Sequence, residues 1–173
     1  HTLAGVPVGE LNVERVECVL ESDPFIADAD IYIDAENKVH IGVQQRQPIL
    51  RVIDRNGLNY YLDGEGKKMP LSKHFTARVL VATGNIAPHV PDFLTRKKKH
   101  VLQELFKLTE RIRKDEFLQP LIEQIHVNKN KEFVLTPKVG KQLIELGSLE
   151  DLENKIFRLK TFYKEGMPYA GWN

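Results

Sequence analysis

Segments with helical and strand-like hydrophobic patterns alternate along this chain of 173 residues, and their order constrains the fold more than any other feature. Apolar residues recur every three or four positions, as on one face of a helix, at residues 13–20, 101–112 and 149–162. Between them lie strand-length segments: residues 29–34, 39–44, 49–53, 58–62, 78–82, 121–127, 132–136 and 139–145. The order helix, strands, helix, strands, helix predicts an α+β protein, and its short links favour largely antiparallel sheets.

Short-range signals mark the ends of two of these helices. Asn12 can cap the first helix, and the Asp-Pro pair at 23–24 ends it. The motif Ser148-x-x-Asp151 has the form of a capping box and predicts that the last helix begins at Ser148. Gly166 predicts where that helix ends.

Charge is balanced over the whole chain but not along it. Lys and Arg number 25 against 24 Asp and Glu, and the net charge of +1 gives no general attraction to nucleic acid or membranes. Residues 14–36 hold eight acids against Arg15 alone, whereas residues 96–114 hold eight bases against Glu104 and Glu110. Two solvated surfaces explain this pattern, and two binding patches are the alternative.

No arrangement of residues points to catalysis or to a cofactor. The histidines are scattered, without the spacing that places two metal ligands on one helix face: His1, His40, His74, His89, His100 and His126. No serine lies in a Gly-x-Ser-x-Gly setting, and the basic run 96–100 lacks the interleaved aromatic residues of a nucleic-acid surface. We therefore expect an interaction module, with no enzymatic activity, cofactor, metal, small-molecule substrate or nucleic-acid partner.

The lone cysteine and the hydropathy pattern leave the cellular compartment open. Cys18 excludes an intramolecular disulfide, and its helical flanks predict a small buried side chain. No apolar run approaches the roughly 18 residues that a membrane-spanning helix requires.

Aromatic residues gather at the C-terminus of the sequence. Tyrosine and tryptophan are types that anchor protein interfaces when they are partly exposed. We interpret four residues as candidates for binding a partner, with ordinary core packing as the alternative: Phe162, Tyr163, Tyr169 and Trp172.

Four segments, in the same order and at matching intervals, resemble the extracytoplasmic part of the FtsQ/DivIB family of bacterial cell-division proteins. They are Asp23-Pro24-Phe25-Ile26 with Ala29-Asp30-Ile31; Val43-Gln44-Gln45-Arg46-Gln47-Pro48-Ile49; Asp63-Gly64-Glu65-Gly66; and Leu146-Gly147 with Leu152, Lys155 and Leu159. The first two resemble segments of the family's POTRA domain, the third resembles a turn, and the last resembles the start of the final helix. Gln45 stands where the family usually has glutamate.

This resemblance implies a fold in two parts. Residues 1–72 would form a partial POTRA-like domain without its first strand. Residues 73–173 would form an FtsQ-type β domain of largely antiparallel strands with two flanking helices, without its terminal strands. The resemblance also implies a single-pass protein of the cytoplasmic (inner) membrane, anchored by an N-terminal helix outside this sequence, with the present domain in the periplasm.

By the same resemblance, the chain would be a non-enzymatic scaffold of the divisome that links early and late septal proteins. It would bind FtsB- and FtsL-like partners by helix contact and by pairing at a free strand edge. Phe162, Tyr163, Tyr169 and Trp172 would border that site. A POTRA-type chaperoning module in outer-membrane protein insertion or secretion is the alternative, and an enzyme of unrecognised type is a third.

Overall fold

The structure, a computed structural model, describes residue 7 and residues 11–73, 75–98, 100–140 and 142–166. Contacts between residues divide the chain into two compact units, residues 1–47 and residues 48–173. We call them the N-terminal unit and the C-terminal unit.

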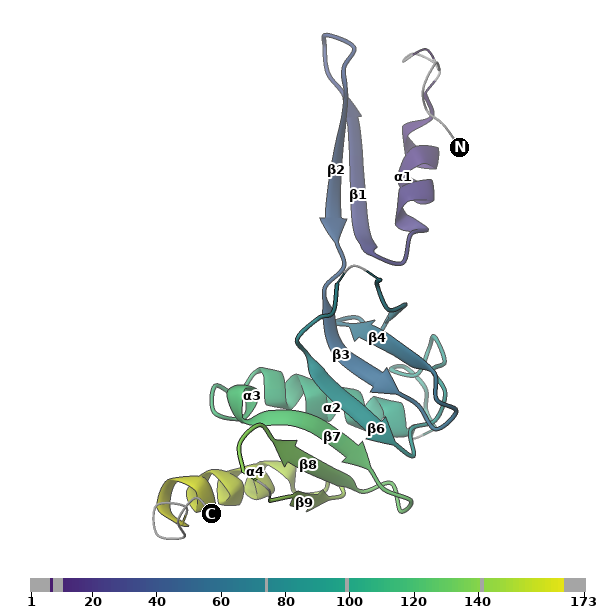
Figure 1. The fold of residues 1–173 in the computed structure, drawn as a ribbon. Helices are drawn as coiled ribbons and strands as arrows, with labels where there is room; N and C mark the ends of the chain where they lie inside the picture. The colour runs from purple at the N-terminus through teal and green to yellow at the C-terminus, as the bar shows by residue number, and fades with distance from the viewer. Residues whose placement is uncertain (1–6, 8–10, 74, 99, 141, 167–173) are drawn as a thin grey trace. The chain divides into compact units, whose positions relative to one another are not determined.

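The N-terminal unit contains one helix and a hairpin of two strands (Figure 1). α1 (Val13–Glu21) is followed by β1 (Ile26–Ile33) and β2 (Val39–Gln45), and the two strands pair antiparallel. Asn12 caps α1 as predicted, because its side-chain oxygen accepts a hydrogen bond from the N–H of Arg15 at 2.7 Å. The sequence pattern therefore located these three elements correctly.

α1 is attached to β1 by apolar packing and by two carboxylates. Val16, Ala29 and Ile31 are the buried apolar residues among those described in this unit. Glu17 accepts a hydrogen bond from the N–H of Ile31 at 2.9 Å, and Glu21 accepts one from the N–H of Ala29 at 3.4 Å. These two side chains thus occupy backbone donors of β1 that do not bond to β2.

The rest of this unit is open to solvent. Every residue of β2 is exposed, including Val39, Ile41 and Val43, although the strand register places them on the same face as the buried residues of β1. Cys18 is exposed too, so the prediction of a buried thiol was wrong. The reason is that α1 buries a single residue, Val16, and turns its other sides to solvent.

A seven-stranded sheet with the order β5-β4-β3-β6-β7-β8-β9 forms the base of the C-terminal unit. Its strands are β3 (Pro48–Ile53), β4 (Asn59–Asp63), β5 (Lys68–Met69), β6 (Leu80–Gly84), β7 (Ile122–Val127), β8 (Phe133–Pro137) and β9 (Ile144–Gly147). The central strands β3, β6 and β7 pair parallel, and the outer pairs are antiparallel. The predicted α+β class with largely antiparallel strands is confirmed.

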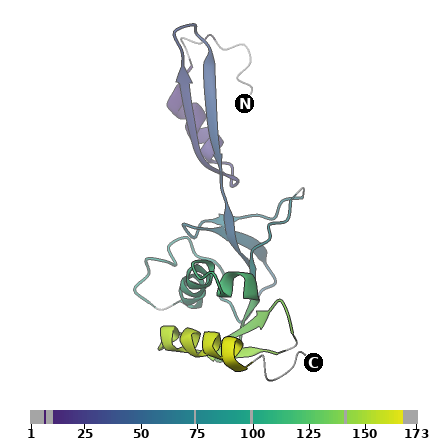
Figure 2. The same cartoon turned by 90° about the vertical axis from the view of Figure 1, so that its left-hand side faces the viewer.

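One core lies between this sheet and its helices. The link from β6 to β7 carries α2 (Val101–Arg113) and the short α3 (Leu118–Leu121), as a parallel crossover requires. Figures 1 and 2 show α2 and α4 (Leu152–Thr161) on the same side of the sheet. The core includes buried residues from strands and helices alike: Leu50, Val52, Leu62, Ala82, Leu102, Leu105, Leu108, Ile112, Ile125 and Phe133.

The boundary between the units differs from the predicted one. We expected the first domain to end at residue 72, but β3 pairs with β6 through Leu50 and Leu80, so residues 48–72 lie in the C-terminal unit. The division falls after Gln47 instead. The POTRA-like character of the N-terminal unit stays a prediction.

β9 begins later than the predicted strand at 139–145. Gly140 has a φ of 94°, a left-handed conformation that turns the chain, and β9 starts only at Ile144. The apolar residues of the predicted strand therefore divide between a turn and a shorter strand.

The start of α4 also differs from its prediction. The helix begins at Leu152, and Asp151 precedes it in a left-handed conformation (φ 54°) without a side-chain capping bond. Ser148 lies in the preceding turn, where its hydroxyl accepts a hydrogen bond from the N–H of Glu150 at 3.4 Å. The predicted capping box is therefore wrong. After Thr161 a π-helical turn, Phe162–Gly166, continues α4.

Candidate partner interface

α4 packs on the core through one apolar face. Ile156 is almost fully buried, and Leu152 and Leu159 pack against the core on either side of it. These positions are separated by four and three residues, so the middle of the predicted stripe is confirmed. Its two ends differ from the prediction, because Leu149 precedes the helix and Phe162 is exposed. The remaining sides of α4 do not face the core.

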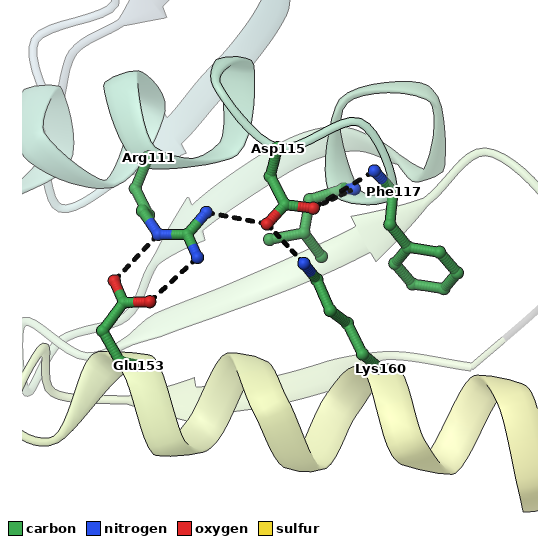
Figure 3. Close-up of polar contacts among 6 residues, drawn as sticks. Arg111, Asp115, Phe117, Glu153 and Lys160 are labelled. Atoms are coloured by element: carbon green, nitrogen blue, oxygen red, sulfur yellow. Dashed lines mark hydrogen bonds and ion pairs between the residues drawn. The ribbon is translucent and has the colours of Figure 1, made fainter.

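A network of charged side chains joins α4 to the end of α2 (Figure 3). Arg111 donates two hydrogen bonds of 2.8 Å to the carboxylate of Glu153 and a third of 2.8 Å to Asp115 Oδ2. Lys160 donates to the same Asp115 oxygen at 2.6 Å. The other oxygen, Oδ1, accepts from the N–H groups of Phe117 at 3.1 Å and of Leu118 at 3.2 Å. Asp115 thus connects two helices and the following turn.

This network keeps Asp115 ionised. Burial acts to raise the pKa of its carboxyl, but hydrogen bonds from Lys160, Arg111 and the backbone N–H groups outweigh burial and hold the pKa well below its usual range. Hydrogen bonding to Arg111 likewise lowers the pKa of Glu153. Because Asp115 is only 7% exposed, its charge is compensated by these fixed partners and not by water.

Two phenylalanines lie on exposed sides of the C-terminal helix. Phe157 is 68% exposed, and Phe162, at the start of the π-helical turn, is 52% exposed. Large apolar side chains with this exposure are typical of interaction surfaces when they lie close to other apolar groups. Phe162 is one of the four residues predicted to bind a partner, and core packing does not account for it.

Tyr163 is placed differently from Phe162. Its ring lies edge-on to Phe117 at 5.9 Å between centroids, and its hydroxyl accepts a hydrogen bond from the amide of Gln142 at 3.2 Å. This tyrosine therefore positions the turn against the domain and is only partly exposed. The other two predicted residues, Tyr169 and Trp172, lie outside the described residues.

The last strand of the sheet offers a free edge near α4. β9 pairs with β8 on one side, and within the described ranges no strand pairs with its other side. A groove of about 300 Å³ lies between β9 and α4, lined by Leu146, Lys155 and Arg158 among others. Leu143, just before β9, is 65% exposed. We call Leu143, the free edge of β9, Phe157 and Phe162 the α4–β9 surface.

Sequence reasoning found part of this surface and missed the rest. It identified Phe162 but not Phe157, which lies beside the buried Ile156 and hence off the core-facing stripe. That offset was a usable signal, because a large apolar residue off the stripe of an amphipathic helix must be exposed or covered by something else. Leu143 gave no such signal, since it fell within a predicted strand.

The described parts of the chain hold no cluster of three or more histidine, cysteine, aspartate or glutamate side chains arranged to bind a metal ion. Within the same parts, no helix has both the length and the apolar character needed to cross a membrane. The α4–β9 surface combines the unpaired edge of β9, with exposed Leu143 just before it, and exposed phenylalanines on the helix across the groove, features that suit the binding of a protein segment.

A comparison with known families gives a match to the C-terminal unit. The family model described as "FtsQ/DivIB, C-terminal related" matches residues 47–173, which comprise the whole C-terminal unit and the residue before it. A search of curated proteins gives no match to the chain. The N-terminal unit, apart from Gln47, lies outside the matched range.

Proposed function

This chain belongs to the FtsQ/DivIB, C-terminal related family, a family of non-enzymatic cell-division scaffolds, and we propose that it links early and late septal proteins through its α4–β9 surface. Its partners in this proposal are FtsB- and FtsL-like division proteins. The domain would act in the periplasm, on the outer face of the cytoplasmic membrane, in a protein held there by an N-terminal membrane helix. The N-terminal unit would be part of a POTRA-like domain.

The observation that carries this proposal is the combination of an unpaired strand at one edge of the sheet with exposed aromatic side chains on the helix across the adjoining groove. A partner segment added to β9 would gain backbone hydrogen bonds, and Phe162, on the same flank of α4 as Lys155 and Arg158 of the groove, would supply apolar contact area next to it. Phe157 lies on the other flank of α4, with Glu153 and Lys160, and would contact a partner that also covers that side of the helix.

The adjoining groove holds Lys155 and Arg158 against Glu145, and Lys155 already donates to the carbonyl of Ser148 at 2.8 Å, so Arg158 would be the cation that attracts an acidic side chain of the partner. Because Glu153 and Lys160 bond to Arg111 and Asp115, α4 is held in place before a partner binds, which lowers the entropy lost on binding.

Substitution of the exposed phenylalanines tests the proposal. The chain is titrated by calorimetry with purified extracytoplasmic segments of FtsB- and FtsL-like proteins. We expect the double variant Phe157→Ser, Phe162→Ser to lose at least about tenfold in affinity, because two exposed aromatic anchors are removed without opening the core. A circular dichroism spectrum shows whether the variant keeps its fold.

Phe75→Ser provides a matched control, because Phe75 is 64% exposed in the same unit but lies between β5 and β6. The affinity of this control variant for the FtsB- and FtsL-like segments should equal that of the unchanged chain. Equal affinities for the control and the double variant would show that the partner binds elsewhere. Failure of the unchanged chain to bind either segment would reject these partners, and retention of barrel-assembly proteins by the chain would then favour the chaperoning alternative.

A further inference from the structure

A second candidate site lies in the C-terminal unit, at the end of the sheet where its parallel strands begin. A cavity of about 490 Å³ opens there, a size within the range of ligand-binding pockets. Ile49 at the start of β3, Leu80 at the start of β6, Ile122 at the start of β7 and Ile112 near the end of α2 form its apolar wall, and all four are buried. None of its lining residues belongs to the α4–β9 surface, so the inference does not depend on the proposed function.

The mouth of this cavity carries an excess of positive charge. Arg78, Arg113 and Lys138 line it, with Glu123 as the opposing carboxylate. Arg113 donates to Glu110 at 2.8 Å, whereas Arg78 and Lys138 have no ion pair with any residue that the structure describes. Two exposed cations beside an apolar wall attract a ligand with both negative charge and apolar surface.

The backbone around Lys138 is held in place at the cavity. Its N–H donates a hydrogen bond of 2.8 Å to the carbonyl of Leu121, which directly precedes β7. This bond fixes the chain after β8 beside the start of β7, so the cation stands on a positioned segment. A site whose supporting backbone is already ordered loses less entropy when a ligand binds.

We propose that this cavity binds an acidic peptide segment, which inserts an aliphatic side chain against the apolar wall and places flanking carboxylates at Arg78 and Lys138. Gln119 and Glu123, on the same lining, offer an amide and a carboxylate to the polar groups of the peptide backbone. The domain would then hold two protein segments at once, one on the α4–β9 surface and one here.

The composition of the lining favours a peptide over other anions. Half of the ten lining residues are charged or polar, which does not suit a long acyl chain. A bare phosphate would leave the isoleucine and leucine side chains of the wall uncovered. No aromatic side chain lines the cavity, so there is no platform on which a nucleotide base stacks.

Fluorescence anisotropy with designed peptides tests the proposal on the full chain. The probe is a labelled eight-residue peptide that alternates leucine with aspartate. Two further peptides replace leucine by serine or aspartate by lysine, and vesicles of phosphatidylglycerol provide a lipid anion. We expect the leucine–aspartate peptide to bind, and both altered peptides and the vesicles to bind at least about tenfold more weakly.

Two charge-reversal variants locate the binding. Arg78→Glu, Lys138→Glu should weaken binding of the leucine–aspartate peptide by about tenfold or more, because two attractive pairs become repulsive. The control, Arg96→Glu, Lys97→Glu, reverses two exposed cations of the same unit that do not line the cavity and should change affinity less than about twofold. Equal losses in both variants, equal binding of the serine peptide, stronger binding of the vesicles, or no binding of the probe at millimolar concentration would each overturn the proposal.

Discussion

In both units carboxylate side chains attach a helix to a neighbouring element: α1 to β1 in the N-terminal unit, and α4 to the end of α2 in the C-terminal unit. The surroundings of these carboxylates differ between the units. In the N-terminal unit Glu17 and Glu21 reach from α1 to backbone N–H groups of β1, and few apolar side chains are buried around them. In the C-terminal unit Asp115 is buried and bonded to Arg111 and Lys160, beside one continuous core. The first unit therefore depends largely on polar contacts, whereas the second depends on apolar burial with ion pairs at its margin.

This difference predicts unequal resistance to unfolding. A two-stranded hairpin is marginal by itself, and the helix packed on this one adds few buried apolar residues, whereas the C-terminal unit has seven strands with a covered face. We expect the N-terminal unit to open locally at lower free energy than the C-terminal unit. Three substitutions examine that expectation.

The largest effect is expected from the core of the C-terminal unit. Phe133→Ala removes a fully buried ring from β8 and should lower the free energy of unfolding by about 3–5 kcal/mol, through lost burial and a residual cavity. Urea unfolding followed by circular dichroism measures it. The control is Val43→Ala in the exposed strand β2, which should cost less than about 1 kcal/mol. Similar losses at the two sites would contradict the contrast between the units.

The buried carboxylate should have the next largest effect. Asp115→Asn keeps the shape of the side chain but leaves Arg111 and Lys160 without their shared anion, which should cost about 3 kcal/mol at pH 7. Because the pKa of Asp115 is lowered in the folded state, its ionisation stabilises the fold above the ordinary aspartate pKa of about 4. That stabilisation is lost as the pH falls through the lower folded value.

Urea unfolding of the chain and of Asp115→Asn between pH 7 and pH 2 measures this dependence. The stability difference between them should be constant near neutral pH and should shrink below about pH 4. A difference that stays constant down to pH 2 would show that the carboxylate charge is not what stabilises this junction.

The smallest effect is expected in the N-terminal unit. Glu17→Ala leaves the N–H of buried Ile31 without its acceptor and should cost about 1.5 kcal/mol. Amide hydrogen exchange of Ile31, which should become faster, measures this local loss. Glu14→Ala is the matched control, since it removes an exposed glutamate from the same helix and should leave that exchange rate unchanged. Unchanged exchange in Glu17→Ala would indicate that packing alone holds α1.

Much of the fold followed from local patterns. The stripes of α1, α2 and α4 and the alternation in β1 and β2 are properties of neighbouring residues, and each predicted its element. The boundary between the units did not follow in this way. Only Arg46 and Gln47 separate β2 from β3, so no loop or change of composition marks the division, which depends on the pairing of β3 with β6.

The junction at Asp115 was also hidden in the sequence. Lys160 is 45 positions away, and in a sequence both residues look like ordinary solvated charges. Of the predicted partner-binding residues, Phe162 and Tyr163 lie in the described part of the chain, and they differ in exposure. Tyr163 is less exposed because it has a hydrogen bond to Gln142 and a ring contact with Phe117, both distant in the sequence. The exposure of a helix residue outside the core-facing stripe can be predicted from its neighbours in the sequence. A contact between residues that are distant in the sequence cannot be predicted in this way.

The attachment of α4 has a mechanical consequence. Glu153 and Lys160, its two polar anchors on α2 and the following turn, are seven residues apart, which is two turns and about 10 Å along the helix axis. A helix with one polar anchor can rotate about it when a force acts on its end. A helix with two anchors can rotate only after one of them has broken. In the proposed complex, tension on a partner bound at Phe157, between the two anchors, would be shared by both and would pass into α2.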